Sequence, residues 1–228
     1  LLKKNFIFIK MENINPTIYQ NTKPYPHIFL DNFLDNKLAK KIQKEILNIP
    51  KSEFDRYDNP FEQKYTLRNK FNYPPLLNEL CLKFTSEDFI KQLSEIVGYK
   101  LINDQSRHFW GVHTYENNDK LDIHVDAGIH PVSNLKKQIT LGLYLSKNYK
   151  EENGCELEIW EGDNSSKNDA KIYNSVEKIS PLFNRLIIFT CNDYSWHGNP
   201  NPIPNFFLLY LIPIANIVNE INIDDLNF

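Results

Sequence analysis

Gln138-Ile-Thr-Leu-Gly-Leu-Tyr-Leu145 shows the clearest alternation of polar and apolar residues in this chain. Successive side chains of an extended strand point to opposite faces, so the isoleucine and the leucines share one face. Thr140, Gly142 and Tyr144 share the other. The apolar face requires a covering layer of helices, whereas the polar face belongs to a strand too apolar for a sheet edge. Gly142 leaves room beside that face, so the stretch predicts a strand between a helical layer and a ligand cavity.

Strand-like patterns of the same kind recur throughout the second half of the chain. The runs are 107–115, 121–126, 155–160, 171–179, 185–191 and 205–213. Several short strands separated by turn residues indicate a β-sandwich or barrel. We therefore expect a mainly β protein with α-helices.

Residues 24–100 have a mixed pattern that predicts a helical support layer. The segment 35–48 places apolar residues on one stripe and lysines on another, and Pro50 ends it. A second helix is expected from Thr85 to Gly98, with Thr85 and Asp88 as a capping box and Gly98 as the left-handed C-terminal residue. The polar residues 51–75 are expected to form a long loop, either over a site entrance or as an ordinary surface loop.

Length and composition fit a single domain. The chain has 228 residues, 41% of them hydrophobic, and 26 Lys and Arg against 29 Asp and Glu. With charges this nearly balanced, we expect no surface-wide electric field of one sign that would attract nucleic acid. No apolar run has the roughly 20 residues that span a bilayer. Three cysteines without regular spacing argue against a disulfide framework. We expect a cytoplasmic protein, monomeric or homodimeric, that binds neither nucleic acid nor membrane.

The two ends of the chain are expected to lie outside the folded core. Residues 1–16 should be a disordered or non-native start, since the first methionine is Met11 and the segment before it lacks the apolar length of a signal peptide. Residues 17–228 should form one domain, with the strands in 101–213 and a tail at 214–228.

A candidate metal site lies in Leu121-Asp-Ile-His-Val-Asp126. His124 and Asp126 are two residues apart on a predicted strand, so both side chains project from one face. Downstream, the apolar strand 185–190 is followed by a turn that presents His197. Two imidazoles and one carboxylate leave three positions open on a metal, which suits ferrous iron with a chelating co-substrate and O₂. Zinc hydrolysis would favour three ligands and a water.

These segments, taken in order, resemble the Fe(II)/2-oxoglutarate-dependent oxygenase superfamily, especially its prolyl-4-hydroxylase-like branch. The matching blocks are Tyr115, His124-Val-Asp126, Gln138 to Ser146, Asn153-Gly-Cys-Glu-Leu157, Pro181 to Phe189 and Trp196-His-Gly198. The resemblance implies a double-stranded β-helix, or jelly-roll barrel, with the N-terminal helices packed on one sheet.

The resemblance also implies an activity and its cofactors. His124, Asp126 and His197 would bind Fe(II), and Tyr115, Thr140 and Tyr144 would line the site of the co-substrate 2-oxoglutarate. The enzyme would be a dioxygenase that uses O₂ to hydroxylate a peptide or prolyl residue, a glycan or a small metabolite, with ascorbate as an optional reductant.

One expected residue is missing. The family places a basic residue at the start of the last strand to pair with the distal carboxylate of 2-oxoglutarate, but no Lys or Arg follows His197. Arg107, Lys136 or Lys137 could replace it. Alternatively, neutral donors from Tyr144, Thr140 and Asn205 could bind the carboxylate, or the chain could use another oxo-acid or none.

Two other functions fit the same residues. A jelly-roll binding module that has lost co-substrate binding would explain the missing cation. A cupin-like metal oxygenase would use O₂ without any oxo-acid. Metal content and a requirement for 2-oxoglutarate discriminate these functions from the first.

Overall fold

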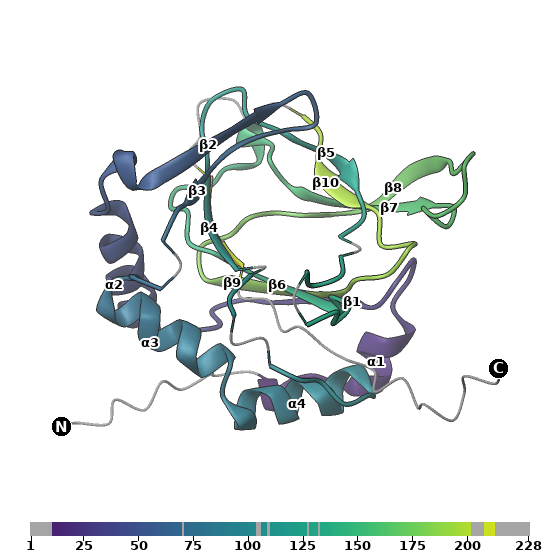
Figure 1. The fold of residues 1–228 in the computed structure, drawn as a ribbon, viewed down its shortest axis with the longest axis horizontal. Coiled ribbons are helices and arrows are strands. Elements are labelled where there is room, and N and C mark those ends of the chain that lie inside the picture. Colours follow the sequence, from purple (N-terminus) through teal and green to yellow (C-terminus); the bar gives the residue numbers. More distant parts are fainter. Residues whose placement is uncertain are drawn as a thin grey trace.

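Antiparallel strands of two groups face each other across the centre of the molecule (Figure 1). The computed structural model describes residues 11–69, 71–103, 106–108, 110–126, 128–131 and 133–201, together with the backbone of 208–212. The first group runs in the order β1, β9, β6, β11, β4 and the second in the order β5, β10, β7, β8. Strand β3 joins β4 of one group to β5 of the other. This arrangement is the expected mainly β jelly roll with helices on one sheet.

The strand bounds agree closely with the alternation in the sequence. The first group consists of β1 (His27–Leu30), β9 (Arg185–Thr190), β6 (Ile139–Tyr144), β11 (Leu208–Ile212) and β4 (Gly111–Tyr115). The second group consists of β5 (Leu121–His124), β10 (His197–Asn199), β7 (Leu157–Gly162) and β8 (Ile172–Ile179). Strand β10 falls where the sequence predicted only a turn, because three residues are too few to show a period of two.

Helices cover the outer face of the first strand group (Figure 1). They are α1 (Pro16–Asn21), α2 (Asn36–Leu47), α3 (Pro75–Phe84) and α4 (Glu87–Val97), and short 3-10 turns occur at Met11–Asn13, Lys51–Glu53 and Glu151–Asn153. Ile139, Leu141 and Leu143 on β6 are fully buried in one core cluster with side chains of α2, α3 and α4. The predicted apolar face is thus confirmed, and it fixes which side of β6 faces the cavity.

The predicted helix 35–48 is confirmed, but the second helix begins differently. Asp35 caps α2, its carboxylate accepting hydrogen bonds from the backbone N–H groups of Lys37 and Leu38. The cap of α4 is Ser86, whereas the Thr85 hydroxyl donates to carbonyls of the preceding helix α3. The proposed capping box was therefore wrong by one residue. The left-handed end at Gly98, with φ of 88°, is confirmed.

The segment 51–75 contains a hairpin where the sequence predicted a long loop. Strands β2 (Phe54–Asn59) and β3 (Glu62–Leu67) pair with each other, and β3 also pairs with β4 and β5. Residues of β2 are half-buried or exposed, so the strand lacks the apolar alternation that would have identified it. The support layer 24–100 is accordingly part helical and part β.

The folded domain begins earlier than expected. Met11 and Ile14 are buried in the helical core, with 2% and 6% of their surface exposed, so residues 11–16 belong to the fold. Residues 1–10 and the predicted tail 214–228 lie outside the described residues. Among the described helices, none has the length and apolar character needed to cross a membrane.

Asn184 and Arg185 fasten β9 to the N-terminal segment. Asn184, fully buried with φ of 65°, donates through Nδ2 to the carbonyl of Leu34 and accepts from its N–H through Oδ1. Arg185 makes two hydrogen bonds to the Asp31 carboxylate, at 2.6 and 2.9 Å. Both side chains are therefore structural, and Arg185 is not among the residues that line the cavity described below.

Candidate metal centre and its cavity

Strands β5 and β10 bring two of the predicted ligands together. His124 and His197 are cross-strand partners, and their ring centroids are 4.5 Å apart. Gly198 allows this approach, since a Cβ atom there would lie 2.7 Å from the carbonyl oxygen of Leu121 and 2.8 Å from that of Asp122. The backbone of β10 can thus lie close to that of β5 because residue 198 has no side chain.

Both imidazoles present the same nitrogen to the centre. Nδ1 of His124 donates to the carbonyl of Asp122, and Nδ1 of His197 donates to the carbonyl of Ser195, each at 2.8 Å. Because a carbonyl only accepts, Nδ1 carries the proton and Nε2 has its lone pair available. The two Nε2 atoms lie 3.6 and 3.8 Å from the oxygens of Asp126. All three ligand atoms are within 4.8 Å of one another.

The two oxygens of Asp126 have different surroundings. Oδ2 accepts from the Lys137 ammonium at 2.5 Å and from the Thr140 hydroxyl at 2.9 Å, whereas Oδ1 faces Nε2 of His124. Burial alone would raise the pKa of Asp126, but the charge of Lys137 and the two histidines hold it well below its ordinary value. Asp126 is therefore an ionised ligand whose second oxygen is already oriented.

The two histidines differ in their affinity for protons. Burial lowers the pKa of His197 to about 4, and the neighbouring His124 adds to this effect. Burial acts in the same direction on His124, but its contact with Asp126 outweighs it, so the pKa of His124 is raised. At neutral pH the imidazole of His197 is thus a neutral ligand, and that of His124 has the higher affinity for a proton.

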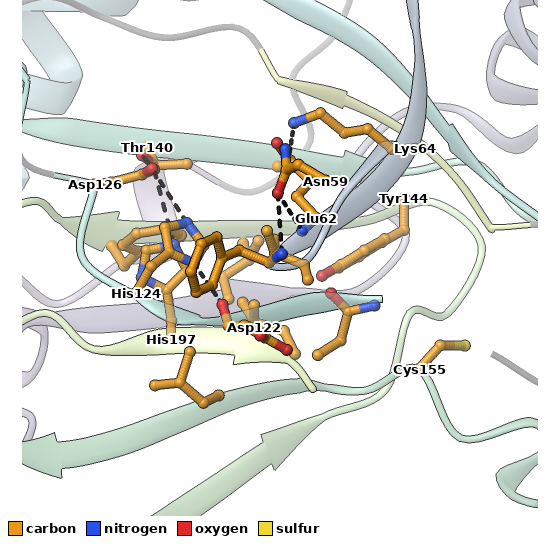
Figure 2. A pocket seen from close by; sticks show the side chains of 18 residues that line it. Asn59, Glu62, Lys64, Asp122, His124, Asp126, Thr140, Tyr144, Cys155 and His197 are labelled. Atoms are coloured by element: carbon orange, nitrogen blue, oxygen red, sulfur yellow. Dashed lines mark hydrogen bonds and ion pairs between the residues drawn. The ribbon is translucent and has the colours of Figure 1, made fainter. Parts of the chain in front are cut away.

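A cavity of about 520 Å³ opens beside these three residues (Figure 2). Thr140, Gly142 and Tyr144 of β6 lie on its wall, as their shared strand face predicted, and Figure 2 shows the Tyr144 hydroxyl directed inward. The remaining wall is formed by residues 59, 61, 62 and 64 of the hairpin, 121–124 of β5, and Asp126, Cys155, Leu157, Ile187, Phe189, His197 and Asn199. The volume suits a small metabolite beside a metal.

Several predicted co-substrate residues lie elsewhere or are engaged. Tyr115 is fully buried in an apolar cluster and does not belong to the cavity wall. The Thr140 hydroxyl is donated to Asp126, and Asn205 lies outside the described residues. Tyr144 remains on the wall. The pKa of its buried hydroxyl is raised by desolvation, so it stays protonated and able to donate.

The three cations considered as replacements also do not face the open cavity. Arg107 packs over the ring of Trp110 and donates to Asn78. Lys136 is exposed, and Lys137 contacts Asp126. The sole Lys or Arg among the described wall residues is Lys64 on β3, which is paired with Glu62.

Lys64 and Asn199 are wall residues that sequence reasoning missed. Lys64 was hidden because its strand was assigned to a loop. Asn199 could have been found from its place two residues after His197, which gives it the same strand face once β10 is recognised as a strand.

The profile of the 2OG-Fe(II) oxygenase superfamily matches residues 110–204, the segment that contains His124, Asp126 and His197. This match covers 95 of the 228 residues of the chain. The matched segment runs from just before β4 to just after β10, so it includes every strand that contributes to the candidate metal centre. No curated protein sequence matches the chain significantly.

Solved structures share the fold of this chain at low sequence identity. A prolyl-4-hydroxylase from Pseudomonas putida is 11% identical with a TM-score of 0.64, covering 90% of this chain and 99% of its own. A Trichoplax adhaerens prolyl hydroxylase in complex with a hypoxia inducible factor peptide fragment is 15% identical with a TM-score of 0.62, covering 90% and 89%. The viral collagen prolyl hydroxylase of Paramecium Bursaria Chlorella virus-1, in its 2OG complex, is 15% identical with a TM-score of 0.53, covering 85% and 96%. These similarities establish the prolyl-hydroxylase-like jelly roll.

The three residues fit the ferrous iron that the superfamily name implies. Two neutral imidazole nitrogens and one carboxylate oxygen are the ligand set of non-haem iron oxygenases, and none of the three is a thiolate that would select a softer metal. The second nitrogen of each imidazole and the second carboxylate oxygen all have protein partners. The ligand atoms are therefore oriented before a metal arrives.

Proposed function

We propose that the chain is an Fe(II)- and 2-oxoglutarate-dependent dioxygenase in which His124, Asp126 and His197 bind the metal. The observation that carries this proposal is the convergence of the two Nε2 atoms and the Asp126 carboxylate within 4.8 Å at the edge of a 520 Å³ cavity. The superfamily match supplies the reaction class.

In this proposal 2-oxoglutarate and the substrate both occupy the cavity. Ferrous iron held by the three residues would bind 2-oxoglutarate and O₂ and couple decarboxylation, which yields succinate and CO₂, to hydroxylation of a substrate C–H bond. The chain contributes orientation and exclusion of water. Ile187 and Phe189, both nearly fully buried, line the cavity with apolar surface, and the ring centroid of Phe189 lies 4.5 Å from that of His197.

The hairpin β2–β3 is proposed to face the incoming substrate. Phe61 at its tip is 70% exposed and lines the cavity, and Asn59 and Glu62 lie beside it. An exposed aromatic side chain next to polar groups can contact a peptide containing proline, a glycan or a small metabolite. The Trichoplax and Pseudomonas structures are prolyl hydroxylases by name, which makes prolyl peptides the first substrates to test.

The proposal is tested by succinate release. Purified protein with Fe(II), O₂ and 2-oxoglutarate should produce succinate, at a rate that rises with a true substrate from a panel of prolyl peptides, glycans and metabolites. Asp126→Ala should abolish it, whereas the surface variant Lys136→Met should not. Succinate production that is the same in Asp126→Ala as in the unaltered protein would contradict the proposal.

A further inference from the structure

The amide nitrogen of Asn199 is a buried donor without a partner at the cavity wall. Asn199 is only 7% exposed, and its Nδ2 atom has no hydrogen-bond acceptor within the part of the chain that the structure describes. A buried donor left unpaired costs free energy, and native proteins retain few of them. Such a donor on the wall of a ligand cavity indicates that an acceptor is supplied by the ligand.

The position of Asn199 relative to the metal centre suggests which ligand atom that is. Asn199 lies on β10 two residues after His197, so both side chains project from one strand face, roughly 7 Å apart along the backbone. Gly198 holds this strand against β5, where the carbonyls of Leu121 and Asp122 leave no space for a side chain. The amide donor of Asn199 is therefore held two residues along the same strand from His197, a proposed iron ligand.

A five-carbon dicarboxylate fits this separation. An oxo-acid that chelates a metal through its 1-carboxylate and 2-oxo group carries its second carboxylate three C–C bonds further on. That carboxylate requires donors, because an ionised group in a partly dry cavity is costly without them. No basic residue occurs after His197 to provide a charge, and the cavity-wall cation Lys64 is already paired with Glu62.

We propose that Asn199 donates its amide N–H to the distal carboxylate of 2-oxoglutarate, with Tyr144 donating from the opposite sheet. This inference rests on the proposed function, and it names the residue that recognises the co-substrate in place of the missing cation. Tyr144 lies on β6 with its hydroxyl directed into the cavity (Figure 2), so the two donors approach the carboxylate from the two strand groups. Asn199 thereby selects a dicarboxylate over an oxo-acid with an apolar end.

The test compares two oxo-acids of equal length on the Mn(II)-loaded protein by calorimetry. One is 2-oxoglutarate, and the other is 2-oxopentanoate, which lacks only the distal carboxylate. Asn199→Val removes the donor with little change in volume, and Asn199→Asp also places a negative charge there. The matched control is Asn201→Val, at an exposed position two residues further on.

We expect Asn199→Val to weaken 2-oxoglutarate binding by on the order of tenfold to a hundredfold, the range of a hydrogen bond to a charged group, and to leave 2-oxopentanoate unchanged. Asn199→Asp should weaken it further. Because Asn199→Val also removes a buried unpaired donor, the urea midpoint of the ligand-free protein should stay the same or rise. If Asn199 had only a structural role, the substitution would instead lower this midpoint.

Each alternative outcome has a distinct meaning. Equal 2-oxoglutarate affinity in the unaltered protein and both variants would overturn the assignment of Asn199 while leaving the proposed function intact. Equal affinity of the unaltered protein for both oxo-acids would also overturn it, since the distal carboxylate would then not be recognised. Binding of neither oxo-acid by the unaltered protein would overturn the proposed function itself, and the inference with it.

Discussion

Lys137 is predicted to stabilise the metal-free protein and to weaken metal binding. Its ammonium lies 2.5 Å from Oδ2 of Asp126, and the two side chains are 7% and 24% exposed. It therefore supplies the positive charge that Asp126 would otherwise obtain from a bound cation. Lys137→Met keeps the length and apolar stem of the side chain and removes only this charge.

The expected loss of stability lies between two limits. Exposed ion pairs contribute about 0–1 kcal/mol, and loss of one partner of a buried pair costs about 3–5 kcal/mol. Since Asp126 is partly exposed and keeps its hydrogen bond from Thr140, we expect Lys137→Met to lower the free energy of unfolding of the metal-free protein by about 2 kcal/mol. Lys136→Met, at the exposed neighbouring position, should change it by less than about 0.5 kcal/mol.

Metal binding should show the opposite effect. A divalent cation restores the charge that the variant lacks, so by linkage Lys137→Met should bind Mn(II) more tightly, by up to about thirtyfold if the whole 2 kcal/mol is recovered. Urea unfolding with and without Mn(II), together with calorimetric titration, measures both quantities. A variant as stable as the unaltered protein, or one that binds Mn(II) more weakly, would refute the reasoning.

The difference in stability between the unaltered protein and Lys137→Met should also depend on pH. The folded-state pKa of Asp126 lies below its ordinary value of 3.8, so ionisation of this carboxylate stabilises the fold above that value, and the contribution is lost as the pH falls through the folded pKa. Because Lys137 is the main group that lowers this pKa, the stability difference between the unaltered protein and Lys137→Met should narrow as the pH falls below about 4.

Three further predictions concern the same centre. Thr140→Val removes the neutral donor to Asp126 without relieving any charge repulsion, so it should weaken Mn(II) binding by about tenfold, the reverse of Lys137→Met; a tighter complex would show that Thr140 does not orient the ligand. Gly198→Ala introduces a Cβ against the carbonyls of β5. It should lower the free energy of unfolding by about 1–3 kcal/mol and weaken metal binding, both measured by urea unfolding with and without Mn(II). Unaltered values would contradict the close approach of β10 to β5. Metal binding near pH 6.5 should release between roughly one half and one proton. His124, whose pKa is raised above its ordinary value of 6.5, is more than half protonated there, whereas His197, with a pKa of about 4, is neutral. Calorimetry in buffers of different ionisation enthalpy counts the protons, and a value near two would contradict the assignment.

The sequence predicted those parts of the fold that are determined by the alternation of polar and apolar residues. The strand at Ile139–Tyr144 has one face in the helical core and the other on the cavity, as its pattern required. The hairpin 54–67 was not predicted, because its partly exposed residues are polar on both faces and its pairing with β4 and β5 depends on contacts distant in sequence. The start of α4 was displaced because Thr85 and Ser86 are both good cap residues, and only their contacts distinguish them.

The metal centre was easier to predict than the co-substrate site. The spacing of His124 and Asp126 predicted a common direction for their side chains, although β5 ends at His124 and Asp126 follows it, and block order pointed to His197. The partners of Asp126 depend on side-chain positions that spacing does not determine: Lys137, considered as an anchor for 2-oxoglutarate, contacts the carboxylate ligand instead. Asn199 could not be placed on the wall until β10 was known to be a strand.

The most direct test of the central claim is an anaerobic titration of 2-oxoglutarate into the Fe(II)-loaded protein, followed by visible absorption. The proposed function predicts a new absorption band that requires both Fe(II) and 2-oxoglutarate, saturates at one co-substrate per chain and is absent in Asp126→Ala. No band, together with no heat of 2-oxoglutarate binding to the Fe(II)-loaded protein, would contradict the claim.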